Sequence, residues 1–146
     1  MKSQVNLVAL SRRAELERCF ALMKLLRPSL VSAPLFADQI TRQFQQGYQL
    51  LGAVHGGAVV GLIGFREVEN LLYGRFIYVD DLVVDTEVRH LGLGASLLEA
   101  VRADAVNREC AHLVLDTGLH MPLAQRFYYR EGMLARGMHF VQPLTT

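Results

Sequence analysis

The residues best suited to chemistry follow an apolar, strand-like run that ends near Val84. Gly92 and Gly94 stand where a helix is expected to begin, and Arg89 precedes them. Backbone N–H groups in the first turn of a helix have no acceptor within the helix, and the helix dipole adds partial positive charge there. Glycines let a phosphate approach these N–H groups closely, and the arginine supplies a fixed charge. The pattern therefore predicts a phosphate or pyrophosphate site.

Two other phosphate-binding loops do not match this stretch. The G-x-G-x-x-G pattern fails because Leu97 stands where its third glycine would be. No Gly-Lys-Ser/Thr sequence occurs in the chain, which excludes the P-loop. Taken alone, the two glycines are also consistent with a purely structural role at a flexible helix N-terminus, beside an arginine that is simply solvated.

Two motifs together resemble the GNAT family of N-acetyltransferases. Arg89-x-x-Gly92-x-Gly94 is similar to the family's Arg/Gln-x-x-Gly-x-Gly/Ala signature. The run from Ala124 to Met133 is similar to its Ala-x-x-Phe/Leu-Tyr-x-x-x-Gly-Phe helix. One short strand is expected between the motifs, as in the family, so the resemblance covers essentially the whole chain.

The chain departs from the family's pattern at two positions. In the family an asparagine often stands three residues before the motif alanine. Met121 occupies that position here, so the polar contact of the asparagine to the cofactor is not expected from this side chain. The phenylalanine that ends the second motif is Met133, a soft apolar substitution. The stretch from Leu115 through Tyr128 and on to Phe140 is loosely similar to aminoalkylphosphonate acetyltransferases, which does not fix a substrate.

The resemblance implies a GNAT fold with acetyl-CoA as cosubstrate, held in a cleft where two strands splay apart. Backbone groups of Leu82, Val83 and Val84 would pair with the pantetheine arm like an added strand. The pyrophosphate would be held by the turn of Arg89, His90, Leu91, Gly92, Leu93, Gly94 and Ala95.

The register of the second motif selects Tyr128 as the catalytic acid. A phenol within hydrogen-bond reach of the departing CoA thiolate can protonate it. Phe127 and Tyr129 are its neighbours on the expected helix, and an aromatic at any of these positions also fits a purely structural role in the core.

An amine acceptor must lose a proton before it attacks, and a carboxylate or histidine near the thioester can accept that proton. Many members of the family carry an acidic residue at the position of Asp81, which makes Asp81 the first candidate for base or acceptor anchor. Asp80 is the second candidate, since adjacent strand residues face opposite sides and only one is expected to point into the cleft. His120 and a water molecule are further candidates for the group that accepts the proton. Asp80, Asp81 and His120 are also each consistent with an ordinary solvated surface residue.

The acidic residues before the turn form a cluster without an intervening positive charge. It comprises Asp80, Asp81, Asp85 and Glu87. Such a cluster favours a cationic acceptor, although a solvated loop explains Asp85 and Glu87 equally well. The histidines show no H-E-x-x-H spacing and no cysteine in frame, so no metal is expected.

Hydrophobic periodicity predicts the order β-α-α-β-β-β-α-β-α-β. This is a mixed α/β fold with a mostly antiparallel sheet and helices on both faces. The first helix is expected between Ser11 and Pro28, and the second between Ser32 and Gly47. Gly56-Gly57 predicts a hairpin. Leu134–Val141 is expected to be the final strand, and residues 1–146 a single N-acetyltransferase domain.

Composition narrows the class of protein. Of the 146 residues, 51% are hydrophobic and 20% charged, which excludes disorder, and the net charge of +1 argues against nucleic-acid binding. No apolar run is long enough to span a membrane, and the N-terminus turns polar too early for a secretory leader. Cys19 and Cys110 are far apart and read as free thiols. We therefore expect a cytoplasmic protein that binds neither membrane nor nucleic acid.

The function predicted from the sequence is acetyl transfer from acetyl-CoA to a primary amine of a small molecule, by direct attack. Both cysteines lie outside the two motifs, which favours direct attack over an acyl-enzyme route. Two alternatives stay open: a protein or peptide N-acetyltransferase, and a non-catalytic CoA or acyl-CoA sensor of the same fold. A homodimer through the apolar C-terminal run is a further possibility.

Overall fold

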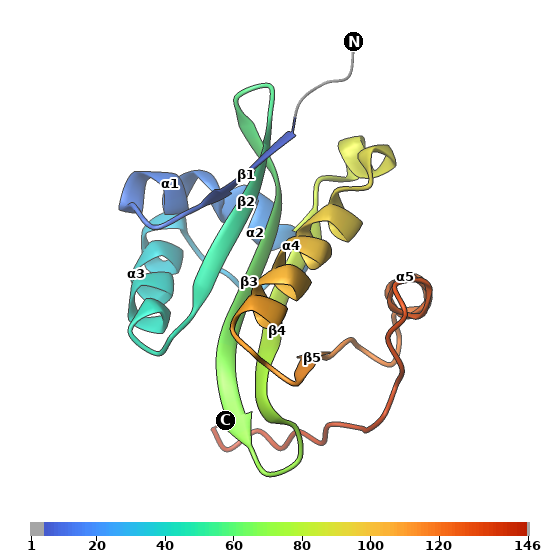
Figure 1. Ribbon diagram of the computed structural model, residues 1–146. Coiled ribbons are helices and arrows are strands. Elements are labelled where there is room, and N and C mark those ends of the chain that lie inside the picture. Colours follow the sequence, from blue (N-terminus) through green and yellow to red (C-terminus); the bar gives the residue numbers. More distant parts are fainter. Residues whose placement is uncertain (1–4, 146) are drawn as a thin grey trace. The chain divides into compact units, whose positions relative to one another are not determined.

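A five-stranded sheet in the order β1-β2-β3-β4-β5 forms the centre of the computed structural model (Figure 1). The structure describes residues 5–145 apart from the side chain of His90. Residues 1–4, at the start of the N-terminal run, and residue 146 lie outside the described part. The strands are β1 (Val5–Ala9), β2 (Gln49–His55), β3 (Ala58–Asn70), β4 (Gly74–Val84) and β5 (His112–Leu115). The helices are α1 (Arg13–Arg18), α2 (Phe20–Leu26), α3 (Ala33–Phe44), the 3-10 helix η1 (Thr86–Leu91), α4 (Leu93–Asn107) and α5 (Pro122–Arg130).

Strand pairing is antiparallel from β1 to β4, and β5 lies parallel to β4. This arrangement confirms the mixed α/β class and the predicted parallel crossover through α4. The predicted hairpin is also confirmed: it joins β2 to β3, and Gly56 and Gly57 have φ of 58° and 79°. Two successive positive φ angles suit a two-residue turn that matches the twist of the strands, and glycine adopts them without steric cost.

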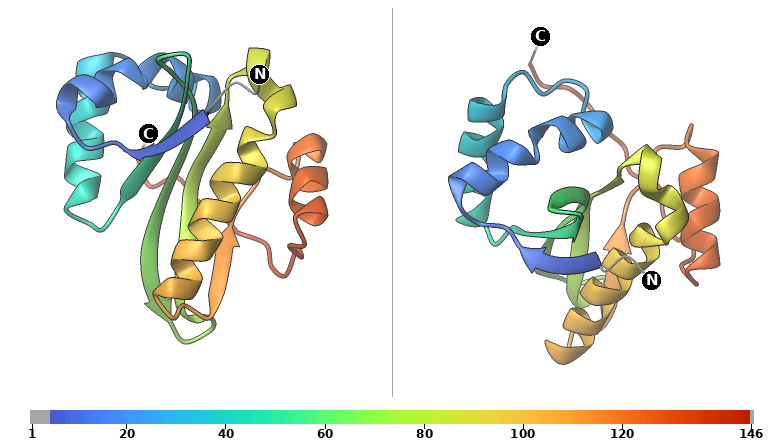
Figure 2. Two further views of the ribbon diagram at one scale, coloured as in Figure 1. Left: turned by 45° about the horizontal axis from the view of Figure 1, so that its top comes forward. Right: turned by 90° about the horizontal axis from the view of Figure 1, so that it is seen from above.

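Helices cover both faces of the sheet, as predicted (Figure 2). Leu62 of β3 belongs to the core cluster shared with α1, α2 and α3, where Leu16, Met23 and Phe36 are buried. The neighbouring Gly61 faces the other side, where Leu97 of α4 would lie 3.0 Å from a Cβ placed on the glycine. The alternation of strand side chains thus gives each helical layer its own half of the core.

The first predicted helix is divided into two. α1 ends at Arg18 and α2 begins at Phe20, while Cys19 between them remains in the right-handed helical region. The N-cap of α1 is Arg12 rather than Ser11. The carboxylate of Glu15, at the third helical position, accepts hydrogen bonds from the backbone N–H groups of Arg12 and Ser11. The predicted cap of α3 is confirmed, with the Ser32 hydroxyl accepting from the N–H of Leu35 at 3.3 Å.

The chain divides into two compact units, Met1–Leu115 and Asp116–Thr146. The second contains α5, and Gly132 with φ of 86° follows its end. The expected strand at Leu134–Val141 is wrong: the described residues of this segment carry no strand. An alternating apolar pattern forms a strand only where a neighbouring strand supplies hydrogen bonds, and no described segment pairs with this one.

Candidate active site

The last residues of β4 extend beyond the region in which β4 pairs with β5. The parallel pairing runs from Phe76↔His112 to Val79↔Leu115, whereas β4 continues to Val84 along β3. The three residues expected to bind pantetheine, Leu82–Val84, therefore lie beyond the part of β4 that β5 pairs with. Extended backbone in this position has N–H and C=O groups suited to an added strand.

The register between β3 and β4 shifts at the same place. Gly64 pairs with Asp81, but Phe65 pairs with Val79, so Asp80 is the extra residue of a β-bulge. A bulge leaves one residue without an opposite partner and changes the direction of the strand. Strict alternation predicts that only one of Asp80 and Asp81 lines a given face; the bulge interrupts the alternation here, and both residues line one pocket.

The predicted phosphate-binding turn contains a helix start, preceded by η1. Gly92 ends η1 with φ of 67°, a left-handed conformation that favours glycine, and it is also the N-cap of α4. A Cβ on Gly92 would meet nothing within 4 Å, so the space above the turn is open. The N–H groups of Leu93, Gly94 and Ala95 occupy the first turn of α4, where a helix offers them no acceptor.

The flanks of this turn are held by hydrogen bonds between residues close in sequence. The carbonyl of Gly92 accepts from both the N–H and the hydroxyl of Ser96, and the carboxylate of Asp85 accepts from the N–H of Glu87 at 3.0 Å. Arg89 is exposed and accessible to an anion. The side chain of His90, also a predicted cofactor contact, lies outside the described residues.

Each of the two aspartates at the bulge is paired with an arginine. Arg66 donates to both carboxylate oxygens of Asp80, at 2.9 and 2.8 Å. Arg27, at the end of α2, donates to Oδ1 of Asp81 through Nε at 3.0 Å and lies 2.9 Å from the same oxygen through Nη2. The same Nη2 donates to the carbonyl of Asp80 at 2.7 Å. These arginines balance the charge of the acidic cluster at Asp80 and Asp81.

Tyr48 holds the second oxygen of Asp81. Its hydroxyl donates to Oδ2 at 2.7 Å, and its ring is buried. A Cβ on Gly64 would lie 1.7 Å from that hydroxyl oxygen, so the phenol occupies the space that a side chain at Gly64 would fill. Burial, followed by the charge of Asp81, raises the pKa of Tyr48 and keeps the hydroxyl protonated as a donor.

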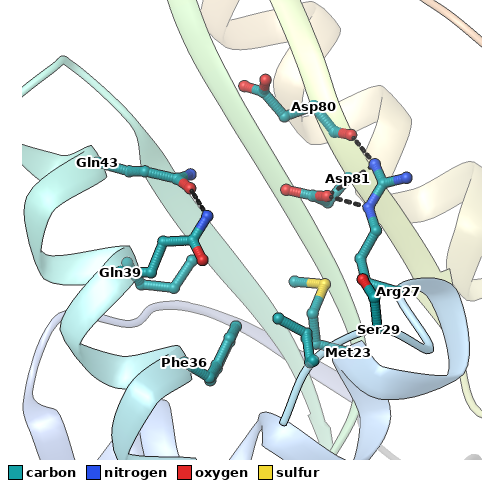
Figure 3. Close-up of a pocket in the computed structure, with 10 residues that line it drawn as sticks. Met23, Arg27, Ser29, Phe36, Gln39, Gln43, Asp80 and Asp81 are labelled. Atoms are coloured by element: carbon teal, nitrogen blue, oxygen red, sulfur yellow. Dashed lines mark hydrogen bonds and ion pairs between the residues drawn. The ribbon is translucent and has the colours of Figure 1, made fainter. Parts of the chain in front are cut away.

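A pocket of about 310 Å³ opens between α2, α3 and β4. In Figure 3, Arg27 and the two aspartates face the amide side chains of Gln39 and Gln43 across it. The lining comprises Met23, Arg27, Ser29, Leu30, Phe36, Gln39, Ile40, Gln43, Asp80 and Asp81. Sequence reasoning missed most of these, since only the two aspartates carried a signal. Neither Arg27 nor Tyr48 was among the candidate site residues.

The second motif lies in the second unit, on α5. Tyr128 is half-buried, and burial raises the pKa of its phenol, which keeps the proton that a general acid must donate. Its ring meets that of Phe127 edge-on, at 5.2 Å between centroids, while Tyr129 is exposed. His120 is exposed on the loop before α5. The amide of Gln125 steadies that loop by donating to the carbonyls of Gly118 and Leu119.

Among the residues that the structure describes, no group of three or more His, Cys, Asp or Glu side chains is arranged to hold a metal ion. Within the same residues, no helix is both long and apolar enough to cross a membrane. Cys19 is buried in the core, and burial raises the pKa of its thiol to about 11. Such a thiol carries little thiolate at neutral pH and is a poor nucleophile.

Comparison with models of protein families identifies the family of this chain. The model of the acetyltransferase (GNAT) family matches residues 16–133, which include both motifs. The chain belongs to this family. It is accordingly an N-acetyltransferase that uses acetyl-CoA, as the two motifs predicted. No sequence match to a curated protein is significant.

Solved structures share the GNAT fold over nearly the full length. Aminoglycoside N-acetyltransferase AAC(6')-Iy, solved with CoA, has a TM-score of 0.82 at 15% identity and covers 99% of this chain and 98% of its own. Ribosomal-protein-alanine N-acetyltransferase from Brucella melitensis biovar Abortus 2308 has a TM-score of 0.81 at 19% identity, covering 97% and 100%. An acetyltransferase from Trypanosoma brucei has a TM-score of 0.78 at 20% identity, covering 97% and 100%. At these identities the likeness shows the fold alone.

Proposed function

We propose that this GNAT enzyme transfers the acetyl group of acetyl-CoA directly to the primary amine of a small molecule bound beside Asp81. The observation that carries the proposal is the pocket of about 310 Å³ at the β4 bulge. This volume is at the lower end of the range for small-molecule sites, roughly 300–1,000 Å³. It suits one compact acceptor better than an extended peptide.

Acetyl-CoA would bind along two features already described. The backbone of Leu82–Val84 would pair with the pantetheine arm, beyond the last residue that β5 pairs with. The turn from Arg89 to Ala95 would take the pyrophosphate, because it combines free helix N–H groups with an exposed arginine. The open space above Gly92 supports this assignment.

Tyr128 would act as the general acid. In direct transfer the amine nitrogen forms a bond to the acetyl carbonyl carbon, and the carbon–sulfur bond breaks with its electron pair leaving on sulfur. The CoA thiolate then takes the phenolic proton, and the phenol recovers a proton from solvent. The motif register and the raised pKa of Tyr128 support this role.

Asp81 would anchor the acceptor amine. Its two oxygens already accept hydrogen bonds from Arg27 and Tyr48, and a carboxylate has further lone pairs to offer an ammonium group. The proton that the amine must lose would pass to water, with Asp80 and His120 as the other candidates.

The decisive experiment is an acetylation assay with acetyl-CoA over a panel of small amines, amino acids and short peptides. Asp81→Asn is expected to lower kcat/KM by about 10–100-fold, because it removes the anchoring charge. Asp104→Asn on α4, outside the pocket lining, is the matched control and should remain near wild type. A wild-type enzyme that acetylates peptides and no small amine would overturn the choice of acceptor, and one that binds acetyl-CoA but acetylates nothing would favour the sensor alternative.

A further inference from the structure

We infer that the acceptor is a zwitterion, a small molecule that carries an anionic group close to the amine to be acetylated. The inference rests on the proposed function and names the class of its substrate. It follows from the ion pair of Arg27 and Asp81 and from the hydrogen-bonding capacity that each member retains.

The donors and acceptors of this pair are only partly used. The Arg27 guanidinium donates through Nε and Nη2 to Asp81 and to the carbonyl of Asp80. Among the described residues, none accepts from its Nη1, which has two N–H groups. Asp81 accepts two contacts from Arg27 at Oδ1 and one from Tyr48 at Oδ2. Of about four lone-pair sites on a carboxylate, one at Oδ2 remains.

These remaining groups complement a zwitterion. An ammonium can donate to Oδ2 of Asp81 while a carboxylate accepts from Nη1 of Arg27, and both contacts are charge-assisted. Arg27 can bind the anionic group of the acceptor while Asp81 binds its ammonium group. Arg27 and Asp81 therefore stay paired with each other when the acceptor binds. A bare alkylamine can make only the first of the two contacts.

The exposure of the two side chains orients the acceptor. Asp81 is 13% exposed and Arg27 is 50% exposed, so the carboxylate lies deeper than the guanidinium. The ammonium is therefore directed inward to β4, and the anionic group lies toward the mouth of the pocket. This orientation brings the reacting amine, rather than the anion, next to the strand proposed to bind pantetheine.

The rest of the lining does not supply a competing charge. Charged side chains among the lining residues are limited to Arg27, Asp80 and Asp81, all of which the structure describes. The carboxylate of Asp80 is held by both nitrogens of the Arg66 fork. The opposite wall consists of the neutral amides of Gln39 and Gln43 (Figure 3). A polycation would thus meet one anchoring carboxylate and one repelling guanidinium.

The test is a matched substrate series: an α-amino acid, its amide, and the amine that lacks the carboxyl group, for several side chains. An aminophosphonate is included to separate carboxylate from phosphonate recognition. We expect kcat/KM for the zwitterions to exceed that of both neutral-tailed analogues by about tenfold or more, which is the worth of one charge-assisted contact. The amide amine loses its proton more readily, so intrinsic reactivity would give the opposite order.

Arg27→Gln should lower kcat/KM for the zwitterion about tenfold more than for the bare amine, which abolishes the preference, and Arg27→Lys should restore part of it. Arg18→Gln, which removes an exposed charge from α1, is the control and should retain the full preference. Acetyl-CoA binding and Tm, measured for each variant, show whether it is folded.

If the wild type acetylates bare amines as efficiently as amino acids, the zwitterion inference is overturned and the proposed function stands. If no amine is acetylated at all, the zwitterion inference is tested by calorimetry, which measures binding of the amino acid to the protein loaded with acetyl-CoA. Binding that Arg27→Gln abolishes supports the zwitterion site although the proposed activity has failed. Absence of binding overturns the inference.

Discussion

The hydroxyl of Tyr48 lies 2.7 Å from Oδ2 of Asp81, although Tyr48 precedes β2, Asp81 lies on β4 and the two residues are 33 positions apart. The contact is possible because Gly64, the cross-strand partner of Asp81, has no side chain in the path of the phenol. Tyr48 thus fixes one carboxylate oxygen from the core side, and Arg27 fixes the other from the pocket side. The orientation of the proposed anchor is set before any acceptor arrives.

Gly64→Ala is expected to destabilise the protein by roughly 3 kcal/mol, from overpacking and a lost hydrogen bond to a charged group. The new Cβ would lie 1.7 Å from the Tyr48 hydroxyl oxygen and 2.3 Å from Cζ, so the ring must move away from Asp81. Gly61→Ala is the matched control. Its Cβ would meet the flexible end of Leu97 at 3.0 Å, with Cβ of Ala53 at 3.4 Å and the carbonyl of Val83 at 3.7 Å, and we expect a cost of about 1 kcal/mol or less. Urea unfolding measures both, and equal costs would contradict the role of Gly64.

Tyr48→Phe should cost about 1–3 kcal/mol at neutral pH, since the carboxylate of Asp81 loses a buried hydrogen-bond donor. It should also change the dependence of stability on alkaline pH. Burial raises the pKa of Tyr48 in the folded protein, while in the unfolded chain the phenol titrates near 10. Above about pH 10 the unfolded state therefore binds fewer protons than the folded state, and stability falls as pH rises.

This slope approaches about 1.4 kcal/mol per pH unit for one tyrosine. Tyr48→Phe should remove this contribution and leave those of Cys19 and Tyr128, whose pKa values burial also raises. Tyr129→Phe, which changes an exposed phenol, is the matched control. Urea unfolding between pH 8 and about pH 11 compares the three proteins. An unaltered slope in Tyr48→Phe would show that another group dominates alkaline unfolding.

Features set by local chemistry were predictable from the sequence. The Gly56-Gly57 turn, the Ser32 cap and the helix start at Gly92 each depend on residues within a few positions of one another. Both motifs lie in such local elements, which explains why they identified the family. The expected strand at Leu134–Val141 failed because an apolar pattern does not specify a pairing partner.

The proposed acceptor pocket could not be predicted in this way. Arg27 and Asp81 are 54 positions apart, and only the packing of α2 against the sheet brings them together. The bulge at Asp80 has no signal in the sequence, yet it places two adjacent aspartates in one pocket. For the same reason the acidic cluster was interpreted as an unbalanced negative patch, whereas Arg27 and Arg66 balance its two innermost members.

Gly92→Asp should weaken binding of acetyl-CoA more than Gly92→Asn does. Both residues tolerate the left-handed conformation of Gly92 better than other side chains do, and both project into open space. They differ in charge, and only the aspartate repels a pyrophosphate. We expect Kd to rise about tenfold more in the aspartate variant at low salt, and the difference to shrink as salt screens it. Calorimetry in low and high salt measures this, and identical affinities would place the pyrophosphate elsewhere.

The final prediction concerns Tyr128, the proposed general acid. Tyr128→Phe keeps the ring and its edge-on contact with Phe127, so Tm and acetyl-CoA affinity should change little. Only the hydroxyl is lost, and it acts in the transition state. Turnover should therefore fall by about 10²–10⁴-fold with acetyl-CoA binding retained. Tyr129→Phe alters the next, exposed residue of α5 and should stay active.

The pH profile separates an acid from a structural tyrosine. Because burial raises the pKa of Tyr128, the phenol keeps its proton through neutral pH, and the wild-type rate should fall only above about pH 10 as the acid ionises. The residual activity of Tyr128→Phe should lack this alkaline decrease, measured over a range where unfolding controls show that the variant is intact. If Tyr129→Phe loses activity and Tyr128→Phe does not, the motif register is displaced by one residue. If neither variant is slowed, the thiolate leaves without the help of a tyrosine on α5.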